Sequence, residues 1–239
     1  MAKQKAKKWI TTTNRFVAFL DIMGFKDFVS RNSHDKVYEM LKKLSRSKKI
    51  IDKLVPGNVS SNYYGKGIYT TSFSDSIILF STDDTQDSFD LFSSSVAYIL
   101  SEAMKDSIPM KGAIAHGIIS VDKERQIYFG QPLIDAYLLQ EDVNYYGVVA
   151  HNSIDHYFLT NKIEDYIRSM YANIKTPLKA GRIDHHNLNW FVNLRADNED
   201  IRLRKRRFNR YMDKLRALTS GTPRKYIDNT VDVFNELYK

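Results

Sequence analysis

Short runs of β-branched and aromatic residues follow one another closely along this 239-residue chain. Residues 69–81 form one such run on either side of Asp75, and residues 111–120 are followed, after a polar turn at 121–126, by a second run at 127–129. Runs this close together can pair only as antiparallel neighbours, because a parallel pair needs a crossover of a dozen or more residues. The sequence therefore predicts hairpins within a largely antiparallel sheet.

Segments with helical periodicity separate these strands and predict helices that pack on the sheet. In residues 34–54 apolar side chains recur near helical spacing among lysines, and residues 85–105 and 130–141 form two further helical segments. The order of elements contains many hairpins and few long crossovers, which fits an α+β fold. We expect a largely antiparallel sheet with flanking helices, followed by a helical C-terminal extension.

The length of the chain is sufficient for a full hydrophobic core. We expect a flexible basic tail at residues 1–14, a main domain at residues 15–174, and a C-terminal extension at residues 175–239 in which a hairpin and helices pack on the main domain. The sequence has no cysteine, which excludes disulfides and thiolate zinc sites and suits a reducing compartment. No run approaches the roughly 18 apolar residues of a membrane span, so we expect a cytoplasmic protein with no membrane partner.

The net charge of +8 raises the question of an anionic partner. Much of the positive charge lies in the N-terminal tail and in residues 202–210, a stretch that we expect to form the solvated face of one helix. On this interpretation no nucleic acid is a partner. The alternative is that these cations contact an anionic ligand or partner.

Two aspartates occupy positions from which carboxylates can converge. Asp21 ends an apolar strand at residues 15–21, and Asp75 lies at the predicted hairpin tip. If the strands are neighbours, the two carboxylates can bridge hard divalent cations, which also take oxygen ligands from substrate phosphates. Between them, Gly24 would let backbone N–H groups approach an anion at a helix start. The alternative is that Asp75 only forms the turn and Asp21 only caps a helix.

The sequence Asp-Ile-Met-Gly-Phe at residues 21–25, together with the aspartate of residues 72–76, resembles the two metal-binding motifs of class III adenylate and guanylate cyclases. Lys111 with Gly117, and the turn at residues 128–138, resemble two later motifs of that family, so the resemblance covers residues 15–157. It implies a cyclase catalytic domain at residues 15–174. It also implies that two divalent cations, Mg²⁺ or Mn²⁺, are held by Asp21, Asp75 and the carbonyl of Ile22.

The same resemblance assigns substrate contacts. Backbone around Gly24, Phe25 and Lys26 would hold the triphosphate, and Lys111 stands where the family places a phosphate-binding arginine. Thr71 and Ile127 occupy the two positions that read the base in purine-selective members, where an adenine cyclase would want lysine and aspartate. Because family sites form between two such domains, the resemblance also implies a homodimer with shared active sites.

Two further positions depart from the family pattern. The transition-state asparagine and arginine fall on Ile134 and Leu138, so another basic residue substitutes, catalysis is slower, or the chain is a catalytically silent nucleotide-binding module. The motifs at residues 72–76, 111–117 and 130–141 also resemble the single-domain cyclases of Pycsar antiphage defence, which make cyclic UMP or cyclic CMP. This resemblance implies a pyrimidine cyclase, with UTP favoured over CTP, whose product is read by a separate cyclic-nucleotide-binding effector.

Overall fold

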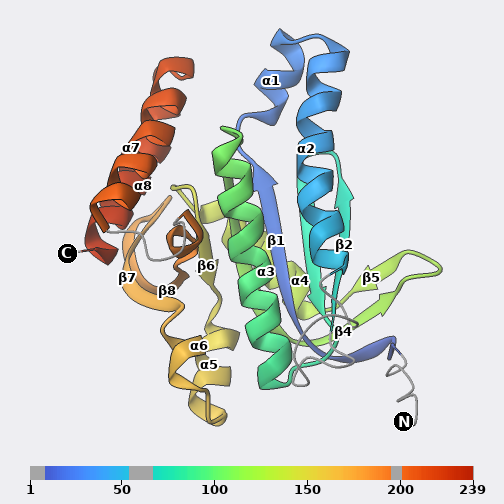
Figure 1. The fold of residues 1–239 in the computed structure, drawn as a ribbon. Coiled ribbons are helices and arrows are strands. Elements are labelled where there is room, and N and C mark those ends of the chain that lie inside the picture. Colours follow the sequence, from blue (N-terminus) through green and yellow to red (C-terminus); the bar gives the residue numbers. More distant parts are fainter. Residues whose placement is uncertain (1–8, 54–66, 195–200, 239) are drawn as a thin grey trace, which may run out of the picture.

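The computed structural model describes residues 9–53, 67–194 and 201–238. In this part of the chain, an eight-stranded sheet has helices on both of its faces (Figure 1). On β1 (Thr12–Ile22), Phe16 packs on Phe89 of α3 (Gln86–Lys105), whereas Phe19 packs on Tyr137 of α4 (Gln131–Asp142). Side chains alternate between the faces of a strand, so α3 and α4 cover opposite faces.

The sheet has the strand order β2-β3-β1-β4-β6-β8-β7, with β5 paired to the far end of β4. The strands not yet bounded are β2 (Ile68–Phe73), β3 (Ser76–Ser81), β4 (Met110–Asp122), β5 (Ile127–Phe129), β6 (Val148–Ala150), β7 (Tyr171–Leu178) and β8 (Gly181–Leu188). Of the pairings in this sheet, β4 with β6 is parallel and the others are antiparallel. The predicted α+β fold with a largely antiparallel sheet is therefore confirmed.

Both predicted hairpins are present, but the central strands are longer than the apolar pattern indicated. β1 begins at Thr12 because Thr12 pairs with Ser120 of β4. Val121 and Asp122, which were expected in the turn, belong to β4 because they pair with Tyr128 and Ile127 of β5. Hydrogen bonding along a neighbouring strand extends an element past the point where its apolar pattern ends.

Several helices complete the main body of the described chain. α2 (His34–Lys53) lies beside α3, and its residues Leu44 and Ile51 are buried in the main core. Thr85 caps α3 by accepting a hydrogen bond from the backbone N–H of Ser88 at 3.4 Å. The short helices are α1 (Phe25–Arg31), α5 (Asn152–Thr160) and α6 (Asp165–Arg168).

The C-terminal part joins the sheet and then forms helices. β8 pairs with β6, so the boundary expected between residues 174 and 175 falls inside β7 of the same sheet. After the short helix η2 (Trp190–Leu194), helices α7 (Ile201–Leu218) and α8 (Arg224–Leu237) pack together through stacked Phe208 and Phe234, whose ring centroids are 4.0 Å apart. Of the predicted N-terminal tail, residues 1–8 lie outside the described residues, and residues 12–14 belong to β1.

No helix in the described ranges is both long and apolar enough to cross a bilayer.

Candidate active site at the end of β1

The structure brings the two predicted metal-binding aspartates together. Asp21 is the penultimate residue of β1, where it pairs with Ser76 of β3 on one side and Lys111 of β4 on the other. Asp75 lies in the tight turn between β2 and β3. The backbone N–H of Ile22 donates to the backbone carbonyl of Asp75 at 3.1 Å, which fixes the turn against the end of β1.

The position of Asp21 disfavours its negative charge. The pKa of its carboxyl is raised to about 6, first by partial burial and then by the negative charges of Asp75 and Glu141, while the positive charge of Lys111 opposes them. Two neighbouring carboxylates in a partly dry site repel one another. A divalent cation between them would remove that repulsion.

The groups available at this position fit hard divalent cations. Asp21 and Asp75 offer carboxylate oxygens, and the main-chain carbonyl of Ile22 offers another oxygen, which is the ligand type that Mg²⁺ and Mn²⁺ prefer. Within the described ranges there is no group of three or more His, Asp or Glu side chains that could hold a metal. A cation at Asp21 and Asp75 would therefore keep coordination positions for water or substrate phosphates.

The backbone after Asp21 turns sharply at Gly24. Gly24 precedes α1 with a φ of 73°, in the left-handed region that favours glycine, and its carbonyl accepts from the N–H of Phe28 at 2.9 Å. Phe25 packs against the core, whereas Lys26 is exposed. The first turn of α1 thus begins within four residues of Asp21, with Lys26 on the outside.

Lys111 is buried against the end of α4, which sequence reasoning did not predict. Its Nζ donates to the backbone carbonyls of Glu141 and Val143, both at 3.3 Å, and only 5% of the residue is exposed. Burial lowers the pKa of Lys111, and the negative charges of Glu141 and Asp21 oppose that effect. The ammonium therefore connects the carboxylate of Asp21 with the C-terminus of α4. Nothing in the residue pattern signalled this contact, because it depends on how α4 crosses the sheet.

The structure does not bring Thr71 and Ile127 to one face. Tyr69 and Thr71 lie two apart on β2 and share a face, and the hydroxyl of Tyr69 lies 2.7 Å from that of Tyr128 on β5. Tyr128 therefore points towards β2, so its neighbour Ile127 projects from the opposite side of β5. Tyr69 and Tyr128 are polar groups that sequence reasoning missed, although Tyr128 lies within the motif at residues 128–138.

Ile134 and Leu138 form part of an exposed apolar surface. They lie one turn apart on α4 and are 51% and 57% exposed. We call the exposed apolar side chains of α4 the apolar surface, and its members are Ile134, Tyr137 and Leu138. Ile118, Ile127 and Phe129 are also exposed, but they project from the other face of the β4–β5 hairpin.

Comparison with solved structures identifies proteins of similar fold. The catalytic core of a rhodopsin-guanylyl cyclase with converted specificity, in complex with ATPαS, matches with a TM-score of 0.53 at 14% identity, over 74% of this chain and 94% of that one. The adenylyl cyclase CyaB from P. aeruginosa matches with a TM-score of 0.47 at 14% identity, over 74% of this chain and 94% of that one. A bacterial light-regulated adenylyl cyclase matches with a TM-score of 0.47 at 12% identity, over 84% and 98% of the two chains.

Comparisons with protein-family models and with curated proteins give no match. The structural likeness therefore rests on the arrangement of the sheet and its helices, and most directly on the guanylyl cyclase core. The likeness extends over 74% of this chain, which includes the mixed sheet and helices on both of its faces. The chain has a class III nucleotide cyclase-like fold.

Proposed function

We propose that this chain is a pyrimidine nucleotide cyclase that converts UTP to 3′,5′-cyclic UMP and pyrophosphate. The observation that carries the proposal is the pair of aspartates at the end of β1, held together by the hydrogen bond between Ile22 and Asp75. The pair lies at the end of a sheet of the class III cyclase type. Carboxylates in this arrangement suit phosphoryl transfer assisted by two cations.

In this proposal, Asp21, Asp75 and the carbonyl of Ile22 hold two divalent cations, Mg²⁺ or Mn²⁺. When bound, these supply Lewis-acid polarisation of the ribose 3′ hydroxyl and charge neutralisation at the phosphates. Backbone N–H groups that follow Gly24, with Phe25 and Lys26, bind the triphosphate. The 3′ oxygen forms a bond to the α-phosphorus, the bond from that phosphorus to the β-phosphate oxygen breaks, and the hydroxyl proton leaves to solvent.

In this proposal Lys111 has a structural role, whereas the resemblance implied a contact with the substrate phosphates at its position. Its ammonium donates to the carbonyls of Glu141 and Val143 and lies close enough to Asp21 for the two charges to interact. A buried ammonium in this position balances part of the negative charge of the aspartate pair while no cation is bound. We propose that Lys111 keeps Asp21 and the end of α4 in place, and that any contact with the substrate comes second to this role.

The preference for a pyrimidine rests on the sequence resemblance and on Thr71. Thr71 lies on the same sheet face as Asp21 and lacks the charge that an adenine-reading lysine would supply, whereas Ile127 projects from the other face and takes no part in this argument. The sequence resemblance to antiphage cyclases favours UTP, with CTP as the alternative. In that context the product is a second messenger for a separate effector in antiphage defence.

We also propose that the protein works as a homodimer with shared active sites. The apolar surface on α4 exposes large side chains to solvent in the single chain, and burial against a second copy would remove them from water. Association through one self-complementary surface generates a two-fold dimer with two equivalent sites. Ile134 and Leu138 would then serve association at positions where the family has transition-state residues.

A catalytically silent nucleotide-binding module is the second candidate. The apolar side chains of Ile134 and Leu138 favour it, since neither can donate a hydrogen bond to a charged transition state. Retention of both Asp21 and Asp75, in contact through the turn, favours the enzyme.

One experiment separates these possibilities. The purified protein is incubated with ATP, GTP, CTP and UTP at equal concentration plus Mn²⁺, and the products are identified by mass, with Asp75→Ala as the matched control. We expect cyclic UMP from the wild type and no cyclic product from the control. A dominant cyclic AMP or cyclic GMP product would refute the pyrimidine proposal, and cyclic CMP would correct the base. Nucleotide binding without any product would favour the silent module.

A further inference from the structure

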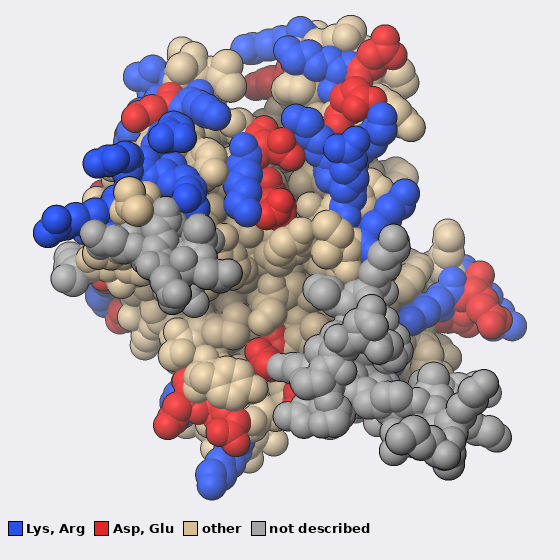
Figure 2. Space-filling model, in the orientation of Figure 1, with Lys and Arg blue, Asp and Glu red and all other residues tan. Residues whose placement is uncertain are grey.

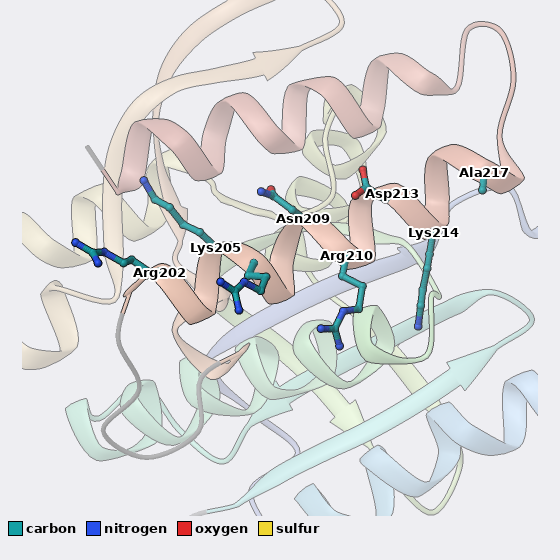
Figure 3. A pocket seen from close by; sticks show the side chains of 8 residues that line it. Arg202, Lys205, Asn209, Arg210, Asp213, Lys214 and Ala217 are labelled. Atoms are coloured by element: carbon teal, nitrogen blue, oxygen red, sulfur yellow. The ribbon is translucent and has the colours of Figure 1, made fainter.

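Helix α7 presents one side lined with cations, which we call the basic face. Figure 2 shows lysine and arginine side chains gathered over α7, and Figure 3 shows Arg210 and Lys214 extending from α7 on the side turned away from α8. The opposite side of the helix is buried in the core, through Phe208, Met212 and Leu215. The members of the basic face are Arg202, Lys205, Arg206, Arg210 and Lys214.

Four cations of the basic face have no acidic partner among the described residues. No carboxylate in the described part of the chain forms an ion pair with Lys205, Arg206, Arg210 or Lys214. The nearby Asp213 pairs with Arg216 at 3.4 Å. Cations on other elements do have acidic partners, for example Lys43 with Asp106 at 3.2 Å and Arg182 with Asp232 at 2.6 Å.

This arrangement costs helix stability. Arg202, Arg206, Arg210 and Lys214 follow one another at intervals of four residues, and like charges at that spacing on a helix destabilise it by about 0.2–0.5 kcal/mol per pair. A solvated face needs only polar residues or mixed charges to keep the helix soluble. Within this row, Arg206, Arg210 and Lys214 have no acidic partner in the described part of the chain, and such a run of like charges is instead the pattern of a surface that meets a polyanion.

We infer that the basic face binds the phosphate backbone of a nucleic acid duplex. From Arg202 to Lys214 the helix rises about 18 Å, so the cations can contact several phosphates of an extended polyanion at once. A duplex carries about one negative charge per 1.7 Å of its axis, which provides this density. The exposed side chains between residues 205 and 214 include no aromatic ring on the basic face, so they offer no platform for stacking single-stranded bases.

A membrane surface fits the same helix less well. A helix that lies in a bilayer interface inserts an apolar side among the acyl chains. In α7 that side is occupied: Phe208 and Met212 are fully buried, and Phe208 stacks on Phe234 of α8. The apolar side chains that α7 does expose, Ile201, Leu203 and Leu218, lie near its two ends and form no continuous side for insertion, so its middle offers charges that contact phosphates.

The inference is independent of the proposed cyclase activity. The basic face lies on α7, whereas Asp21 and Asp75 lie at the end of β1 and in the β2–β3 turn. Contacts to phosphates alone do not read sequence, so binding should depend on salt and not on the order of bases.

The test measures binding of the full-length protein to a fluorescently labelled 20-base-pair DNA duplex by anisotropy, between 50 and 200 mM NaCl. With four or five cations engaged, we expect the logarithm of the association constant to fall against log salt with a slope of about −4. The double variant Arg206→Glu/Arg210→Glu should weaken binding at least tenfold at 50 mM NaCl and make the slope shallower by about 2. The variant Asp75→Ala should bind as the wild type does.

The matched control reverses two exposed cations on another helix, Arg46→Glu/Lys49→Glu on α2, which changes the net charge by the same amount. It should keep most of the affinity. Equal losses in both double variants would overturn the inference, because binding would then follow net charge alone. So would tighter binding of a single-stranded 20-mer than of the duplex, or binding to anionic phosphatidylserine vesicles with none to the duplex. Circular dichroism melts of each variant exclude unfolding as the cause.

Discussion

Asp21 is held in a position that works against its own charge. It lies next to Asp75, near Glu141, and partly out of solvent, with Lys111 as the opposing cation. An ionised carboxylate in this position lowers the free energy of unfolding, and a bound cation would remove that penalty. Cation binding would then stabilise the folded state. The raised pKa of Asp21 is therefore the property expected of a cation site while no cation is bound.

The raised pKa of Asp21 makes the stability of the folded protein depend on pH. The pKa of Asp21 is raised from 3.8 to about 6 in the folded state, so the folded protein holds the proton more tightly than the unfolded chain does. In metal-free buffer the free energy of unfolding should therefore rise as pH falls from about 7 to about 4. Asp21→Asn removes this effect. Two pKa units correspond to about 2.7 kcal/mol, and because Asp21 is partly exposed we expect the variant to be about 1–2 kcal/mol more stable at pH 7.

Urea unfolding of the wild type and of Asp21→Asn at pH 4, 5, 6 and 7 checks this prediction. The difference in stability should shrink as pH falls towards 4, because Asp21 is then protonated in the folded state and partly protonated in the unfolded chain. Addition of Mn²⁺ at pH 7 should raise the melting temperature of the wild type and leave that of the variant nearly unchanged. A constant difference across the whole pH range would show that the carboxylate of Asp21 carries no such cost.

At Gly112, strands β1 and β4 lie too close together for a side chain to fit between them. A Cβ on Gly112 of β4 would lie 2.5 Å from a side-chain carbon of Leu20 and 2.6 Å from the backbone oxygen of Phe19. A Cβ on Gly24 would meet no atom within 4 Å, yet its φ of 73° is one that an L side chain rarely adopts. The two glycines are therefore required for different reasons, one for space and the other for backbone conformation.

These reasons predict different costs for two matched substitutions. Gly24→Ala should cost about 1–2 kcal/mol, which is the strain of a left-handed residue with a Cβ. Gly112→Ala should cost more, above about 3 kcal/mol, because the new methyl group meets the backbone of β1, which cannot move without breaking the pairing that places Asp21. Chemical unfolding of both variants measures the difference. Equal losses, or a greater loss for Gly24→Ala, would contradict the close approach of the two strands.

The elements that sequence patterns predicted are those whose partners are close in the chain. The β2–β3 and β4–β5 hairpins follow from short apolar runs around a polar turn, and the helices follow from their periodicity. The apolar run at residues 148–150 indicates the short strand β6, but its pairing with β8 could not be assigned, because the contact joins Val148 to Leu188, forty residues apart. Register between distant strands is set by the packing of the whole sheet and leaves no local signal.

The residues of the candidate site also fall into those that the sequence could predict and those that it could not. Asp21 and Asp75 could be predicted because each ends or turns a strand that the pattern identifies. The contacts of Lys111 with the end of α4, and the pairing of Tyr69 with Tyr128, could not. They depend on the path of α4 and on the curl of the β4–β5 hairpin, which bring residues 59 apart into contact.

At the scale of the whole molecule, two exposed surfaces have opposite chemistry. The basic face on α7 belongs to the C-terminal helices, and the apolar surface belongs to α4. Because they lie on different elements, one molecule can use the apolar surface to associate with a second copy and keep the basic face for a polyanion. In such a cyclase, dimerisation through the apolar surface would assemble the active sites, and the basic face would contact the anionic partner.

The last prediction concerns assembly through the apolar surface. The double variant Ile134→Glu/Leu138→Glu places two negative charges where the proposed dimer buries apolar side chains, so the protein should become monomeric and lose cyclase activity. Both positions are more than half exposed in the single chain, so the fold itself should be retained. Leu159→Glu is the matched control, because Leu159 on α5 is 82% exposed but lies outside the apolar surface, and this variant should keep the mass and activity of the wild type. Sedimentation velocity gives the mass of each variant and circular dichroism its fold. A double variant that stays dimeric would exclude α4 from the interface, and one that becomes monomeric with undiminished activity would show that each active site is complete within a single chain.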